Sequence, residues 1–438
     1  MKPVPRCALI LGILLHTSAI AAQEDPLDEL FTDSPPETQA PANDPTESIE
    51  LAPEPPPAAA RQPARRVIEE IVVTAQKKEE SLRDVPISVM ALGEDFLKET
   101  AVTDLNDVTF FTPNVKVNAT PSIGFVAMRG IGSGSNKGVE QSVGLVVDGI
   151  YYSRLAYVTD GMLDLSRIEV LRGPQGTLFG KNTVAGAFNM TTGSPSEELS
   201  GSVDLLQGQL RHSRQRGAIG GPLIDGLVNY RIAFSRERRE GQVRNSAASI
   251  DPDSLAYAQH IHEPARRLRD RDNLAGRLKL NFPNLREGLD LSLGVTRSEV
   301  RQNSLGLEMF LASPRTERAY SAVDPNFETI PDNVASIGNR EFADRNTTSY
   351  TLHADQDLGD FVLSLVGGYS DYVQDDLLDA DFGPVRFLFL ANQDRYSQRS
   401  LELRLASPPG ELEYVAGLYY FGSDLDGHSL ITLDVTGR

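Results

Sequence analysis

Beyond Pro195 the chain repeats one pattern, in which apolar and polar residues take alternate positions. Val228, Tyr230, Ile232 and Phe234, for example, alternate with small or polar residues. Because successive side chains of a β-strand point to opposite faces, the pattern predicts strands with one apolar and one polar face. It recurs in residues 274–281, 289–296, 350–355, 361–370, 401–405 and 412–421.

Two kinds of protein fit such strands. A soluble β-sandwich turns the apolar face inward, whereas a transmembrane barrel turns it toward lipid. The alternation alone does not distinguish them. The connections favour a barrel, which has short turns at one end and long loops at the other. Short segments (282–288, 357–360 and 407–410) here accompany two long polar stretches, 241–272 and 301–348.

The amino terminus has the features of an export signal. A basic start precedes an apolar run at residues 8–15 that is too short to cross a bilayer, and Ala19-Ile20-Ala21 fits a cleavage site. We therefore predict that residues 1–22 are a signal peptide. The single cysteine, Cys7, lies within it, so the mature chain has none for disulfides or thiolate zinc sites. No later segment offers the ~18 apolar residues of a membrane helix.

Residues 23–66 are predicted to be a disordered tether. The part from Gln23 to Ala60 contains ten acidic residues, nine prolines and no Lys or Arg. Such a segment buries too little apolar surface to offset the entropy lost on ordering. The formal charge of the whole chain is -19, which disfavours nucleic acid as a partner.

Residues 168–189, IEVLRGPQGTLFGKNTVAGAFN, form a glycine-punctuated run. A phosphate-binding loop needs four residues between its first glycine and a Gly-Lys pair, followed by Ser or Thr. The spacing does not fit here, because Gly176 lies too near to Gly180 and Gly173 lies too far from it. In addition, Asn182 and not Ser or Thr follows Lys181. Tight turns in a small packed domain are the favoured interpretation.

Three segments in order, MRGIG, SVGLVVDGIYYSR and LDLSRIEVLRGPQGTLFGKNTVAGAFN, resemble the plug domain of TonB-dependent outer-membrane receptors. The resemblance implies an α+β plug domain at residues 81–195, followed by antiparallel transmembrane β-barrel strands at 196–438, in the cell outer membrane. Within the plug, the sequence predicts helices at 93–100 and 104–111, a helical turn at 163–166 and a strand at 168–171. Phe188-Asn189-Met190-Thr191 departs from the isoleucine-rich strand of the family, and altered packing is expected there.

The segment 67–80, which includes IEEIVVTA, resembles the TonB box of the family. An extended β-prone segment can add as a strand to the sheet edge of a partner. The resemblance implies TonB and its inner-membrane energising complex as partners, together with outer-membrane lipid and an extracellular solute ligand. The predicted TonB contacts are Ile71, Val72, Val73, Thr74 and Ala75.

The resemblance also assigns roles to residues of the plug and barrel. Arg129 and Arg172 match plug arginines that pair with barrel glutamates, and Glu402 matches one of those glutamates. The plug core turns are Gly130, Gly149, Gly173, Gly176 and Gly180, and the predicted ligand contacts are Ile123, Gly124, Phe125, Ser133 and Asn136.

The number of strands predicts an incomplete barrel. The family's barrel has twenty-two strands, which at ~10 residues each need ~220 residues before any loop is added. After Pro195 we count about ten strands, and the chain ends in LITLDVTGR, without the usual terminal aromatic residue. We therefore expect a truncated chain.

The favoured function is a TonB-dependent receptor for energised uptake of a scarce solute such as an iron chelate, cobalamin or a carbohydrate. The alternatives are a truncated, non-transporting remnant of such a receptor and a soluble exported β-rich binding protein. His260-Ile261-His262-Glu263 lacks a third metal ligand at a recognisable spacing. We expect no enzyme activity, cofactor or metal site, because no paired carboxylates, nucleophile elbow or metalloprotease motif occurs.

Overall fold

The computed structural model describes most of the chain beyond residue 86. The described residues are 72–73, 80–81, 87–120, 124–134, 139–154, 156–157, 162–250, 264–330, 332–385, 387–408, 410 and 412–433. They all belong to one compact unit, Ile68–Arg438. The predicted signal peptide and tether lie outside them. Within the described part of the chain, no helix has the length and apolarity needed to cross a membrane.

The first half of the described chain consists of short strands and helices. In chain order these are β1 (Val72–Val73), β2 (Glu80–Ser81), β3 (Val89–Gly93), α1 (Glu94–Glu99), α2 (Leu105–Phe111), β4 (Val115–Ala119), β5 (Gly124–Met128), β6 (Ile131–Gly132), β7 (Val143–Val147), β8 (Ile150–Tyr152), β9 (Leu165–Arg172), α3 (Gly176–Phe179) and β10 (Gly186–Thr192). From β3 to β10 they form the plug domain.

The plug is built on a five-stranded sheet in the order β3-β9-β10-β7-β8, with a smaller sheet β4-β5-β6 beside it. Strand β7 pairs with β10 in parallel, and the other neighbours are antiparallel. Helix α2 begins at a capping box, in which Asp104 and Asp107 satisfy each other's backbone N–H groups. Phe188 and Met190, at the predicted departure from the family pattern, are buried in the plug core with Ile168.

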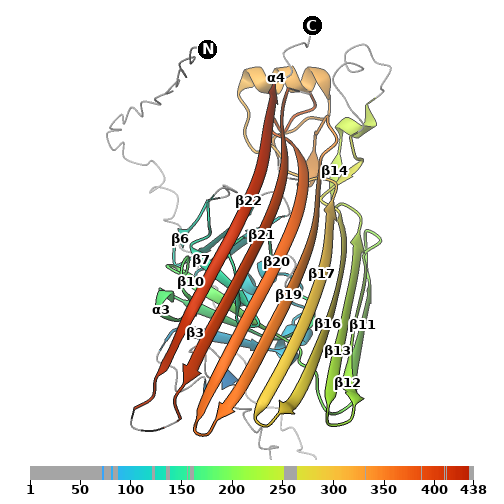
Figure 1. The fold of residues 1–438 in the computed structure, drawn as a ribbon. Helices are drawn as coiled ribbons and strands as arrows, with labels where there is room; N and C mark the ends of the chain where they lie inside the picture. Colours follow the sequence, from blue (N-terminus) through green and yellow to red (C-terminus); the bar gives the residue numbers. More distant parts are fainter. Residues whose placement is uncertain are drawn as a thin grey trace, which may run out of the picture. The chain divides into compact units, whose positions relative to one another are not determined.

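The second half of the chain contains the long strands. These are β11 (Ser200–Gln207), β12 (Ser213–Ile224), β13 (Val228–Arg239), β16 (Arg271–Arg286), β17 (Leu289–Gln302), β19 (Phe342–Leu358), β20 (Phe361–Asp379), β21 (Leu388–Ala406) and β22 (Val415–Leu433). They form one nine-stranded sheet, which we call the wall, and neighbours in the chain are neighbours in the sheet (Figure 1).

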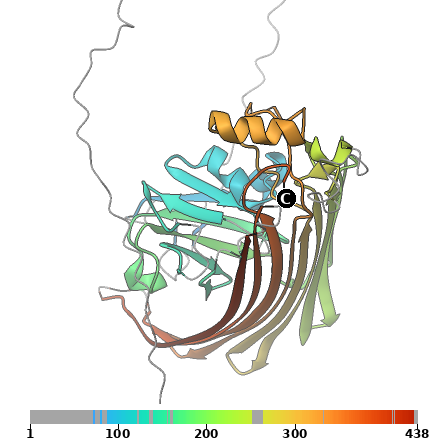
Figure 2. The same ribbon diagram turned by 90° about the horizontal axis from the view of Figure 1, so that it is seen from above.

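Side chains of the wall alternate between two faces, as the sequence predicts. Leu401 and Leu403 are 47% and 39% exposed on the outer face, whereas the side chain of Glu402 between them is 13% exposed on the face toward the plug. Seen from above, the wall curves around the plug (Figure 2). The predicted fold class, an α+β plug followed by antiparallel barrel strands, is confirmed.

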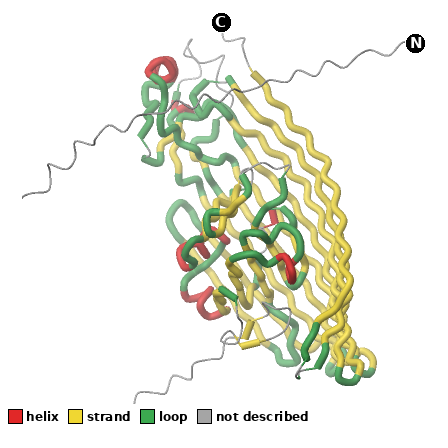
Figure 3. Tube along the Cα trace, turned by 90° about the vertical axis from the view of Figure 1, so that its left-hand side faces the viewer, coloured by secondary structure: helices red, strands yellow, loops and turns green. Residues whose placement is uncertain are grey.

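Long connections at one end of the wall fold together. They contain β14 (Val243–Asn245), the 3-10 helix Ala247–Ser249, β15 (Arg267–Leu268), α4 (Pro314–Val323) and β18 (Val334–Ala335). Strand β14 pairs with both β15 and β18 and, with Ile337, encloses a small apolar core. Figure 3 shows the helices in the plug and in these loops, away from the long strands.

The structure differs from the sequence predictions at several places. Residues 282–286, expected in a short turn, are the end of β16, and the turn is confined to the residues between Arg286 and Leu289. The helical turn expected at residues 163–166 is a bend followed by the start of β9, whose Leu165 pairs with Thr192. Residues 342–348, expected in a loop, begin β19, because pairing with β17 and β20 continues beyond the apolar part of the strands.

Candidate functional site: the plug, its seat on the wall and the TonB-contact strand

The predicted TonB-contact segment is described at two of its five residues. Val72 and Val73 form β1, which pairs antiparallel with Ser81 and Glu80 of β2. Ile71, Thr74 and Ala75 lie outside the described residues. A short extended pair of this kind has the conformation required for adding a strand to a partner. The TonB contact itself stays a prediction.

The glycines of the predicted core turns lie at turns between plug strands. Four of them have positive φ values, which residues other than glycine rarely adopt: 80° at Gly130, 76° at Gly149, 111° at Gly173 and 80° at Gly180. Gly176 is the first residue of α3.

The three charged residues assigned from the family lie in the plug and on the plug-facing side of the wall. A guanidinium nitrogen of Arg129 lies 3.3 Å from the position that a Cβ would take at Gly173, beside Arg172. Glu402 forms an ion pair with Arg404 at 3.6 Å. Pairing of Arg129 and Arg172 with Glu402 stays a prediction.

The predicted ligand contacts are partly described. Phe125 is 36% exposed in β5, next to Gly124. The hydroxyl of Ser133 donates to the carbonyl oxygen of Glu140 at 3.1 Å. Ile123 and Asn136 lie outside the described residues.

A contact that the sequence did not predict joins the plug to the wall through charges. Arg231 of β13 donates from Nε and Nη2 to the two carboxylate oxygens of Asp164, both at 2.6 Å. Lys279 of β16 forms an ion pair with Asp148 at 2.9 Å. Arg277, two residues from Lys279, donates to the carbonyl oxygen of Leu163 at 2.5 Å. These three cations belong to the polar face of alternating strands, which was the only signal in the sequence.

The surroundings of Asp148 keep its carboxylate charged. Burial opposes ionisation, but the positive charges of Lys279 and Arg277 and the hydrogen bonds from Thr192 hold the pKa of Asp148 below its usual value. The backbone N–H and the hydroxyl of Thr192 donate to Asp148 at 2.9 and 2.6 Å. The plug therefore presents an ionised carboxylate to the wall.

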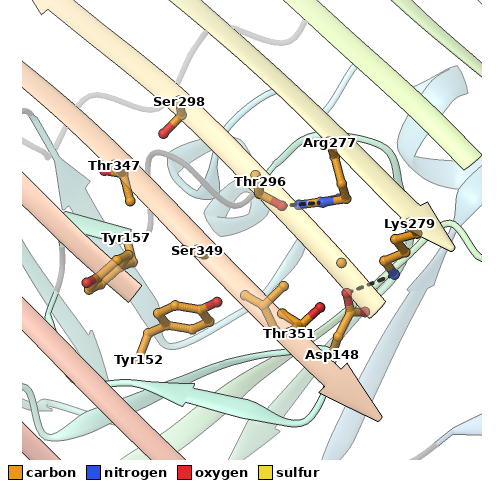
Figure 4. A pocket seen from close by; sticks show the side chains of 12 residues that line it. Asp148, Tyr152, Tyr157, Arg277, Lys279, Thr296, Ser298, Thr347, Ser349 and Thr351 are labelled. Atoms are coloured by element: carbon orange, nitrogen blue, oxygen red, sulfur yellow. Dashed lines mark hydrogen bonds and ion pairs between the residues drawn. The ribbon is translucent and has the colours of Figure 1, made fainter. Parts of the chain in front are cut away.

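A small cavity of about 40 Å³ lies beside this contact, between the plug and the wall (Figure 4). It is lined by hydroxyl groups of β17 and β19 and by Tyr152 and Tyr157 of the plug. Arg277 donates to the hydroxyl of Thr296 at 2.9 Å along its edge. The described residues of the chain contain no His, Cys, Asp and Glu grouping suited to a metal ion.

Uncharged contacts join the plug to β20 and β21. The side-chain amide of Gln398 donates to the carbonyl oxygen of Tyr151 at 2.8 Å. Tyr157 packs edge-on against Tyr372, with 5.5 Å between ring centroids. A Cβ at Gly368 would lie 2.7 Å from Cγ2 of Ile150, so glycine permits this close approach.

A small α+β domain seated against the polar face of a curved sheet, whose other face is apolar, defines a plugged outer-membrane receptor. The chain carries a plug domain of the kind found in TonB-dependent outer-membrane receptors, and its location is the cell outer membrane. The family model of the TonB-dependent receptor plug domain matches residues 81–187.

Three comparisons support this assignment. The chain is 27% identical to the pesticin receptor of Yersinia pestis over 177 residues, which are 40% of this chain and 26% of that receptor. It is 29% identical to the ferrioxamine B receptor of Salmonella typhimurium over 175 residues, 39% of this chain and 23% of that receptor. The structure resembles the ferric yersiniabactin uptake receptor from Yersinia pestis with a TM-score of 0.65 and 20% identity.

The similarity covers only part of each known receptor. The structural match includes 79% of this chain and 50% of the yersiniabactin receptor. The chain therefore spans about half the length of that receptor, and its matches to the two curated relatives span about a quarter of theirs.

Proposed function

We propose that the chain is the plug and amino-terminal barrel portion of a receptor for energised uptake of a ferric chelate. The observation that carries this proposal is the plug itself, held by ion pairs against the polar face of a membrane-type sheet. The two relatives and the solved neighbour described above are receptors for pesticin, ferrioxamine B and ferric yersiniabactin. These ligands favour an iron chelate over a carbohydrate.

The proposed energy input is the binding of TonB to the segment 67–80. We infer that Ile71 to Ala75 add as a strand to the periplasmic domain of TonB, because Val72 and Val73 are already extended. The proposed domain order is a signal peptide (1–22), a tether (23–66), this segment, the plug (81–195) and barrel strands (196–438).

The proposed ligand side of the plug includes residues 123–125, Ser133 and Asn136. Arg129 and Arg172 are proposed to meet Glu402 once the plug is held within the barrel, since a charge shielded from water needs a partner. We infer that the chain acts by binding and transport, as the related receptors do, and not as an enzyme.

Binding of the purified chain to the periplasmic domain of TonB tests the proposal. Val73→Pro removes a backbone N–H donor from the proposed added strand and should abolish binding. Val73→Ala keeps that donor and should bind within about threefold of the unaltered chain. Equal binding by the proline variant would contradict the assignment.

Uptake of a radiolabelled iron chelate separates the two remaining functions. An energised receptor takes up the chelate in cells with active TonB, and Val73→Pro abolishes uptake while the protein stays in the membrane. A truncated, non-transporting remnant binds TonB without uptake. The wall has the exposed apolar outer face of a membrane sheet, which disfavours a soluble binding protein.

A further inference from the structure

The polar face of the wall carries three cations at adjacent positions. Arg231 of β13 lies directly opposite Lys279 of β16 in the antiparallel register, and Arg277, opposite Ala233, lies two residues further along on the same face. Their other register partners, Gly220, Gly294, Thr296 and Ala233, are uncharged. Because like charges facing each other across strands repel, this group of cations destabilises the wall unless another segment neutralises it.

Two carboxylates of the plug contact this group of cations, and no Lys or Arg among the described residues of the plug does so. Asp164 binds Arg231 through both oxygens, and Asp148 binds Lys279. All four side chains are between 12% and 16% exposed. Charges so far removed from water are stabilised only by partners of opposite sign, so each ion pair depends on correct placement of the plug.

The same carboxylates lie where the chain passes from the plug to the wall. Thr192, at the end of β10, donates two hydrogen bonds to Asp148. The backbone N–H of the next residue, Gly193, donates to the carbonyl oxygen of Asp164 at 2.7 Å. A Cβ at Gly193 would lie 2.3 Å from Nε of Arg231. The two ion pairs and this junction therefore form one contact, which we call the seat.

We propose that Asp148 and Asp164 are the residues by which the plug recognises its place on the wall. The cation group on β13 and β16 selects the sector of the wall against which the plug rests. On the same side, Arg271 of β16 forms a further ion pair with Asp104 of the plug at 2.9 Å. On the other side no plug carboxylate forms a described ion pair with the wall: Gln398 and Tyr372 make uncharged contacts, and Lys181 of the plug lies over the ring of Phe421.

One consequence concerns the assembly of the protein. Both carboxylates and all three cations lie within the described chain, on the plug and on two neighbouring wall strands. All residues of the seat are therefore contained in the described part of the chain. It also involves neither the solute nor TonB, so it is independent of the proposed transport function.

Exchanging the charges of one ion pair tests the seat in the purified chain. The rate at which chymotrypsin cleaves the plug measures plug release, because these substitutions neither add nor remove a chymotrypsin cleavage site. Asp164→Arg places a cation against Arg231 and should speed cleavage of the plug about 100-fold. Adding Arg231→Asp restores a pair of opposite sign and should return the rate to within about threefold of the original. A role in packing alone predicts no such rescue.

Two further variants test the proposal if the charge reversal prevents the chain from folding. Asp148→Asn and Asp164→Asn preserve shape, and each should speed cleavage about tenfold. Arg297→Asp, a reversal on the outer face of β17, is the control and should leave the plug protected. Far-ultraviolet circular dichroism verifies that the wall remains folded. The proposal is overturned if the asparagine double variant stays fully protected, or if the exchanged pair restores nothing in a folded chain.

Discussion

Lys279 of the wall and Asp148 of the plug form an ion pair with 2.9 Å between Nζ and Oδ2, in a position that is largely shielded from water. Arg231 and Asp164 form a second such pair in the same contact. Neither pair holds two parts of one strand or helix together. They join the plug to the sheet behind it, and this makes the position of the plug sensitive to single charges.

The first prediction concerns acid. Because its folded-state pKa is lowered, Asp148 contributes stability above its unfolded value of about 3.9, and this stability is lost as pH falls through the folded pKa. Near-ultraviolet circular dichroism of the buried tyrosines Tyr152 and Tyr157 should stay constant from pH 7 to about 5 and change below about 4. Asp148→Asn should reduce this acid step, and a step of unchanged size would assign it to other groups.

The second prediction concerns Gly193. An added methyl group would meet the guanidinium of Arg231 at 2.3 Å and the carboxylate of Asp164 at 2.6 Å. Gly193→Ala should therefore separate the pair and destabilise plug docking by about 2 kcal/mol. Protease protection of the plug measures this. Gly93→Ala has open space around its Cβ and is the control; equal effects of the two substitutions would refute the steric explanation.

The third prediction concerns the close approach of β8 to β20. Gly368→Ala would bring a methyl group to 2.7 Å from Ile150 and should destabilise plug docking by about 1–3 kcal/mol. Ile150→Val in the same chain should recover part of that loss. Gly367→Ala, on the outer face of the same strand, meets its nearest neighbour at 3.5 Å and should cost less than about 1 kcal/mol. Thermal unfolding of the three variants ranks them.

The fourth prediction concerns the long connections that contain β14, β15 and β18. The side chain of Asn245 donates to the carbonyl oxygens of Ala265 and Ile337 and accepts from the N–H of Ile337, all within 3.0 Å. Asn245→Ala leaves these buried groups unpaired. It should destabilise the folded connections by about 1–3 kcal/mol for each unpaired group. Hydrogen exchange should rise around β14 and β18 but not in β20. Unchanged exchange in the loops would show that other contacts hold them together.

Much of the fold was predictable because local patterns determine it. Alternation at residues 401–405 predicted a wall strand, and the helix predicted at 93–100 is α1, Glu94–Glu99. Strand limits were less predictable. The polar residues 342–348 belong to β19 because their backbone groups bond to both neighbours, and backbone pairing does not require an apolar side chain.

The candidate site was predictable only where a family pattern covers it. The glycine turns and Arg129, Arg172 and Glu402 were identified from such patterns. Arg231, Arg277 and Lys279 were visible in the sequence only as polar members of alternating strands. A lone cation on a polar face has no special meaning until the register shows which charges lie next to it.

The sequence by itself determined the class of fold, because two-residue periodicity and turn-forming glycines act through near neighbours in the chain. It also determined that Asp164 and Arg231 are charged. Only the tertiary structure decided that these two residues, 67 positions apart, meet through both carboxylate oxygens. Strand register and the docking of the plug bring them together, and both depend on contacts between distant segments that no local pattern encodes.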